Sequence, residues 1–172
     1  MSEQVLRADL ERDADELTDE EKLDRIVALG FDGDWQLYEK FCRNLKEGLP
    51  PGTGVALRGS VLTNERYEDG RPFDAKGENT SDLDVTLIGE KARALWRDDA
   101  YYIPALHTKP LGDKDPEIAP ELNPLREQLQ KMVGRPVNVQ ATADFILFIR
   151  DVLLDQPYFV IIEPEEDEEP AE

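Results

Sequence analysis

Two aspartates, Asp82 and Asp84, stand one residue apart at the start of the apolar run Asp-Leu-Asp-Val-Thr-Leu-Ile. In a strand, residues i and i+2 point to the same face, so both carboxylates would share one face while Leu83 and Val85 point into the core. Like charges this close repel each other, and a cation between them relieves the repulsion. Mg²⁺ favours one or two carboxylates beside substrate phosphates, so the pair predicts a magnesium site.

A glycine and a serine, Gly59 and Ser60, follow the short apolar run of residues 54–57, which is typical of a buried strand. Glycine lets the backbone approach a ligand closely. Serine adds a hydroxyl and a backbone N–H that can hold phosphate oxygens. A Gly-Ser turn beside an Asp-x-Asp strand therefore predicts a site for a triphosphate and a metal ion.

Taken in order, the segments ALRGS and TSDLDVTLIG resemble the nucleotidyltransferase superfamily of the DNA polymerase β type. They look most like its minimal members, which include small toxin–antitoxin proteins. The resemblance covers about residues 53–162. It implies that Asp82 and Asp84 bind Mg²⁺ and take part in catalysis. It also implies that Gly59 and Ser60 hold the triphosphate of an NTP, with Arg58 and Ser81 beside them.

The reaction that the resemblance implies is transfer of an NMP from an NTP to an acceptor hydroxyl, with release of pyrophosphate. The acceptor would be a protein, an RNA end or a small molecule. The alternative is a catalytically degenerate module of the same fold that binds a nucleotide or a partner protein. A protein partner or a second copy of the chain would then complete the site.

Two features depart from the family's usual pattern. Asp82 lies 22 positions after Ser60, about twice the usual spacer, so we expect an inserted segment at the rim of the site. Its basic residues either contact phosphates or belong to a solvated loop. The second departure is Asn138, which stands where the family often has a third catalytic carboxylate. An amide cannot accept a proton at neutral pH, and Asp144, nearby in the sequence, is the acid that could replace it.

The net charge of −19 is concentrated at the two ends. Residues 1–24 and residues 163–172 each carry −7, so we expect solvated, partly disordered ends or a docking tail for a basic partner. Such an acidic chain lacks the basic footprint of a protein that binds extended nucleic acid. A single cysteine, Cys42, favours the reducing cytoplasm, and neither a secretory signal nor a membrane span is expected.

The pattern of caps and apolar residues predicts an α/β or α+β fold, a small mixed sheet flanked by helices. Two N-terminal helices, at 19–29 and 35–48, begin at Thr18 and Asp34. We expect strands at 54–57, 82–88, 136–140 and 158–162, and later helices at 124–133 and from Thr142 to 154. The predicted domain spans residues 18–162, between an acidic N-terminus of residues 1–17 and an acidic tail of residues 163–172. The lone histidine, His107, is expected in a loop.

Overall fold

The N-terminal third of the chain is helical and precedes the first strand of the sheet. The computed structural model describes residues 10, 12–66, 69–154 and 156–165. The 3₁₀ turn η1 (Ala14–Glu16) leads into α2 (Asp19–Gly30) and α3 (Trp35–Gly48). The Thr18 hydroxyl accepts a hydrogen bond from Glu21 N while the Glu21 side chain accepts one from Thr18 N, which confirms the predicted capping box. Asp34 caps α3 as predicted.

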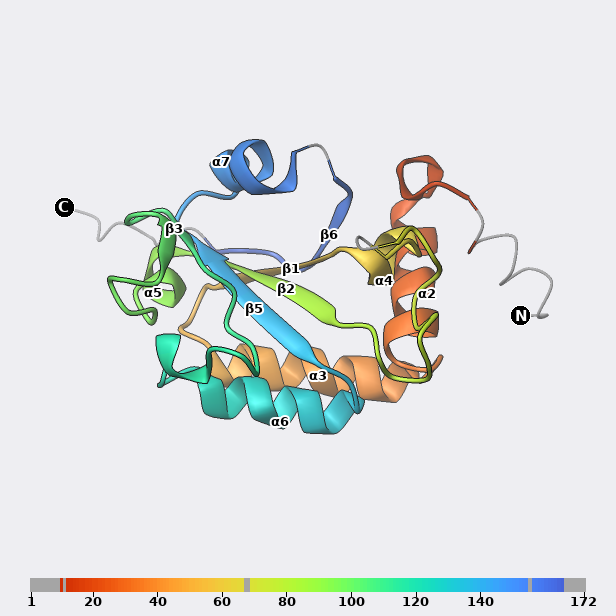
Figure 1. The fold of residues 1–172 in the computed structure, drawn as a ribbon, viewed down its shortest axis with the longest axis horizontal. Helices are drawn as coiled ribbons and strands as arrows, with labels where there is room; N and C mark the ends of the chain where they lie inside the picture. Colours follow the sequence, from red (N-terminus) through yellow and green to blue (C-terminus); the bar gives the residue numbers. More distant parts are fainter. Residues whose placement is uncertain (1–9, 11, 67–68, 155, 166–172) are drawn as a thin grey trace.

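Six strands form one mixed sheet with the order β3-β4-β5-β2-β1-β6. Their bounds are β1 (Gly54–Arg58), β2 (Leu83–Ile88), β3 (Tyr101–Ile103), β4 (His107–Thr108), β5 (Val137–Thr142) and β6 (Tyr158–Ile162). β1 is antiparallel to both β2 and β6, while β2 and β5 are parallel. Because β2 and β5 run in the same direction, the beginnings of these two strands meet at one edge of the sheet (Figure 1).

Short helices and turns connect the strands. They are α4 (Ser60–Thr63), α5 (Glu90–Arg93), η2 (Pro116–Ile118), α6 (Asn123–Val133), α7 (Phe145–Phe148) and the π-helical turn η3 (Ile149–Leu153). Helix α6 carries a proline in its first turn and ends at Gly134, whose φ of 71° is left-handed. The chain therefore forms the predicted mixed sheet flanked by helices.

The two faces of the sheet differ in character. Leu57, Val85 and Val139 belong to the buried core and lie on one face. Helices α3 and α6 lie side by side below the sheet, and α7 lies on the opposite side (Figure 1). The other face carries polar side chains, and the ring of Phe148 in α7 packs against His107 there. One face thus supplies the core, and the other supplies a row of polar groups.

Several elements differ from their predicted form. The predicted helix from Thr142 to 154 begins later, because Thr142 ends β5 and Asp144 caps α7, and its second half, up to Leu153, is the π-helical turn η3. His107 lies in a strand and is fully buried rather than in a loop. Ala14 and Leu17 are buried, so part of the predicted acidic N-terminus packs onto the domain. Residues 1–9 and 166–172, where both acidic ends were expected to be disordered, lie outside the described residues. Among the helices described here, none is long and apolar enough to cross a membrane.

Candidate functional site

The beginnings of β2 and β5 bring the two aspartates and Asn138 together. In the register of the sheet, Asp84 lies opposite Asn138. The Asn138 side-chain amide donates a hydrogen bond to Oδ2 of Asp82 at 2.8 Å. Because Asp82 and Asp84 are two positions apart at the start of β2, both carboxylates reach the polar face, as predicted. These residues form the centre of the candidate site.

The backbone turn at Gly59 lies directly against Asp84. A Cβ atom at position 59 would lie only 2.6 Å from Oδ2 of Asp84. Gly59 also has a φ of 80°, which disfavours residues with side chains. Both constraints require glycine here, so the Gly-Ser turn and the second aspartate of the Asp-x-Asp pair meet as predicted. Ser60 begins α4 and is half-buried beside this turn.

The charge of Asp84 is unfavourable in this position. Burial raises the pKa of the Asp84 carboxyl. The nearby Arg58 acts to lower the pKa, the negative charge of Asp82 raises it further, and a hydrogen bond with Asn138 lowers it. The net direction is upward. A second positive charge beside Asp84 would therefore stabilise its ionised form.

Arg58 points along the polar face toward the interior of the sheet. Its Nε donates to the Thr86 hydroxyl at 3.3 Å, and its guanidinium also donates to the Gln140 side-chain oxygen. The ring of Phe148 lies over the guanidinium, 5.8 Å away. The structure therefore places Arg58 as an internal countercharge to Asp84, with its side chain held by β2 and β5.

Ser81 is buried and bound to the inserted segment. Its hydroxyl accepts a hydrogen bond from Asp74 N at 2.8 Å, and its own N–H donates to Oδ1 of Asp74 at 2.9 Å. The segment's Arg66 forms an ion pair with Asp69 at 3.0 Å, within the segment itself. The structure thus brings Ser81 next to Asp82 but engages its polar groups with Asp74 rather than aiming them outward.

Asp144 is far from the aspartate pair. Its carboxylate caps α7 by accepting a hydrogen bond from Leu147 N at 3.2 Å. It follows the end of β5, whereas Asn138 lies near the beginning, and six residues of extended chain span about 20 Å. Within residues 10, 12–66, 69–154 and 156–165, no three His, Cys, Asp or Glu side chains are grouped so that they could hold a metal. Asn138 therefore stands alone in the third position.

A cavity of about 690 Å³ borders Asp82 and Asn138. Its walls come from the segment around β3 and β4 and from the loop that follows. The charges of its lining are mixed, because both basic residues (Arg97, Lys109, Lys114) and acidic residues (Asp99, Asp113, Asp115, Glu117) border it. Tyr102, which is 59% exposed, adds an aromatic ring. The sequence predicted no element with certainty in this region, because its prolines and charges follow neither a helical nor a strand period.

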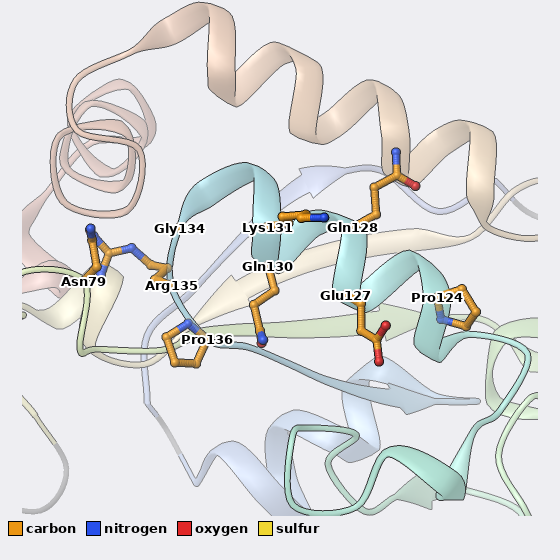
Figure 2. Close-up of a pocket in the computed structure, with 9 residues that line it drawn as sticks. All are labelled: Asn79, Pro124, Glu127, Gln128, Gln130, Lys131, Gly134, Arg135 and Pro136. Carbon is orange, nitrogen blue, oxygen red and sulfur yellow. The ribbon is translucent and has the colours of Figure 1, made fainter.

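A second cavity, of about 780 Å³, lies along α6 (Figure 2). It is lined by Glu127, Gln128 and Lys131, and at its far end by Asn79 and Arg135. Neither aspartate of the candidate site borders it. The cavity beside Asp82 is therefore the one that a substrate of the site would enter.

Comparisons with protein families, with curated proteins and with solved structures give one result. No family model, no curated protein and no solved structure matches this chain.

Proposed function

We propose that this chain is a Mg²⁺-dependent nucleotidyltransferase that moves an NMP from an NTP to an acceptor hydroxyl. The observation that carries the proposal is the arrangement around the start of β2. The glycine turn lies against Asp84, Asn138 bonds to Asp82, and the 690 Å³ cavity opens beside Asp82 and Asn138. Of the two carboxylates, Asp84 thus lies against a close backbone turn, and Asp82 lies beside a space large enough for a small molecule.

The donor set fits Mg²⁺. Asp82 and Asp84 offer hard carboxylate oxygens, and Asn138, which bonds to Asp82, adds an amide oxygen beside them. Mg²⁺ held by these two residues would supply positive charge to neutralise the carboxylates and the triphosphate. Two protein carboxylates completed by phosphate oxygens and water are a usual environment for this ion.

The chain's own residues orient the reacting groups. The Gly59 turn lies directly against Asp84, so a triphosphate bound to the turn would lie close to this carboxylate, and Ser60 adds a hydroxyl beside it. The acceptor oxygen forms a bond to the α-phosphorus while the bond to pyrophosphate breaks. The acceptor's proton leaves to a carboxylate or to solvent, because the amide of Asn138 cannot accept it.

A second candidate function is binding of a nucleotide without transfer. It is favoured by the amide at position 138 and by the role of Asp144 as a helix cap, which leave the aspartate pair without a third carboxylate among the described residues. This candidate keeps the same Mg²⁺–NTP site. The two functions therefore differ in the fate of the nucleotide, not in its place.

The first test is thermal unfolding with each of the four NTPs at millimolar concentration, with and without Mg²⁺. For a ligand at ten times its Kd, we expect about 1.4 kcal/mol of stabilisation and a rise in Tm of roughly 3–6 °C. The double variant Asp82→Asn/Asp84→Asn should lose the rise. The matched control is Glu39→Gln/Glu47→Gln, which removes two exposed charges from α3 on the opposite side of the sheet.

The absence of any Mg²⁺-dependent shift in the wild type would overturn both candidate functions for this chain. If one NTP binds, the two candidate functions are distinguished with that NTP labelled at its α-phosphate. The experiment follows whether the label is transferred to protein, RNA or small-molecule acceptors. Labelling by the wild type supports the transferase. Labelling only by Asn138→Asp, or by neither protein, supports the binding module.

A further inference from the structure

A buried arginine ties the inserted segment to the residue before Asp82. The side chain of Arg135 is fully buried, and its guanidinium donates to both carboxylate oxygens of Asp74, at 2.8 and 3.1 Å. It also donates to the backbone oxygen of Ser81 at 3.1 Å. Two further acceptors, the backbone oxygen of Leu29 and the side-chain oxygen of Asn79, lie at 3.2 Å. One guanidinium thus joins the end of α2, the inserted segment and the start of β2.

These bonds leave the backbone around Asp82 little freedom. Ser81 is held through its N–H, its hydroxyl and its carbonyl by Asp74 and Arg135. On the other side, Leu83 N donates to Pro136 O at 2.9 Å, in the segment that leads into β5. Asp82 is therefore fixed by its two chain neighbours, and the direction of its carboxylate toward Asn138 depends on them.

The geometry of the contact suits arginine specifically. A planar guanidinium can bind a carboxylate through two parallel hydrogen bonds while its remaining donors reach other acceptors. The ring of Phe73 lies 4.6 Å from the guanidinium carbon and covers one of its faces. In Figure 2, Asn79 and Arg135 lie together at one end of the α6 cavity, so the inserted segment meets the α6–β5 connection here.

We infer that Arg135 and Asp74 are positioning residues, which hold the Asp82 carboxylate in the orientation that metal binding requires. The inserted segment then contributes to the site through Asp74, which holds the backbone next to Asp82. From the sequence, the basic residues of this segment were expected either to contact phosphates or to belong to a solvated loop. The inference rests on the proposed function, because it assigns the pair a role in the affinity of the Asp82–Asp84 site for a divalent cation.

The test measures Mn²⁺ binding by the electron paramagnetic resonance signal of free Mn²⁺, together with Tm and hydrogen exchange of residues 81–83. Arg135→Lys keeps the charge but cannot reach all four partners. Asp74→Asn keeps the shape of the side chain and one of its two acceptor oxygens, and it is the second test variant if Arg135→Lys fails to fold. The matched control is Arg93→Gln, at the opposite end of β2, where Arg93 bonds to Tyr101 and Glu90.

We expect both site variants to bind Mn²⁺ at least about tenfold more weakly, about 1.4 kcal/mol, and to exchange faster at residues 81–83. Arg93→Gln should lower Tm and leave Mn²⁺ affinity unchanged. Unchanged Mn²⁺ affinity in Arg135→Lys or Asp74→Asn, whatever the change in Tm or exchange, would overturn the inference and leave the proposed function standing. A wild-type chain that binds no Mn²⁺ would overturn the proposed function, and the positioning role would fall with it.

Discussion

The polar face of β2 and β5 forms one row of side chains with two different ends. At the open end lie Asp82, Asp84 and Asn138, beside a cavity. At the closed end, β5 finishes under α7 and η3, where Thr142 meets His107. The two ends share one sheet face and similar residue types, so their surroundings account for the difference between them.

The closed end balances its polar groups internally. His107 is fully buried, and its Nδ1 lies 2.9 Å from the Thr142 hydroxyl while its Nε2 lies 3.0 Å from Asp151. The ring of Phe148 packs edge-on against the imidazole, with centroids 5.4 Å apart. Both ring nitrogens therefore have protein partners, and this end has the features of a structural network.

The open end does not reach the same balance. Two carboxylates share it with one amide and with Arg58, and the pKa of Asp84, raised first by burial and further by Asp82, stays above its ordinary value despite the guanidinium. Buried groups of like charge are costly unless another charge offsets them. The comparison teaches that a polar cluster points to function where burial and a like charge disfavour the ionised form of one of its groups, as at Asp84, and to stability where its groups hydrogen-bond to one another.

The largest expected effect comes from a substitution in the closed end. His107→Ala should lower the free energy of unfolding by about 3 kcal/mol, because it opens a buried cavity and removes one hydrogen-bond partner each from Thr142 and Asp151. In a chain of this length that corresponds to a fall in Tm of roughly 6–12 °C. Calorimetry measures it. The Mg²⁺-dependent NTP response should survive below the new Tm, and its loss would contradict a purely structural role for this end.

The next largest effect comes from a substitution that disrupts the contact between Gly59 and Asp84 at the open end. Gly59→Ala places a methyl group 2.6 Å from Oδ2 of Asp84 and forces a φ of 80° on alanine, which should cost about 2 kcal/mol and remove the NTP response. Gly33→Ala is the matched control, since Gly33 has a φ of 75° with nothing within 4 Å of an added Cβ. Equal losses of stability in the two variants would show that only backbone strain matters at position 59.

The features of these two ends that could be predicted from sequence are those encoded by residues close together in the chain. The alternation of Asp82, Leu83 and Asp84 predicted two carboxylates on one face, and Thr18 with Glu21 predicted the start of α2. Each of these patterns lies within a few residues and follows from the period of a strand or from the capping geometry of a helix. The strands beside the site could be predicted for the same reason.

The partners of the remaining site residues come from distant parts of the chain. His107 bonds to residues 35 and 44 positions away, and Arg135 bonds to Asp74 across 61 positions. No local pattern encodes such contacts. Arg58 and Ser81 could be placed near the site from sequence, but only the three-dimensional structure shows that the Arg58 side chain bonds to Gln140 and the Ser81 hydroxyl to Asp74 N.

A smaller effect sharpens the contrast by adding charge to the open end. Asn138→Asp places a third carboxylate where Asn138 now donates to Asp82. Without metal, repulsion should lower Tm by about 2–6 °C at pH 7, the shift that 1–1.5 kcal/mol produces. Added Mg²⁺ or Mn²⁺ should restore more Tm in the variant than in the wild type. Equal recovery in both proteins, measured by thermal unfolding in EDTA and in each metal, would place the cation away from position 138.

The smallest effect removes one charge from the open end. Because the pKa of Asp84 is raised in the folded state, its ionised form costs stability at every pH above the pKa of the unfolded chain, about 3.9. In EDTA at pH 7, Asp84→Asn should therefore raise Tm above that of the wild type. The gain should vanish below about pH 3.9, where the carboxyl is protonated in both states. A lower Tm than wild type at pH 7 would instead mean that Arg58 already compensates Asp84, and that the open end is as balanced as the closed one.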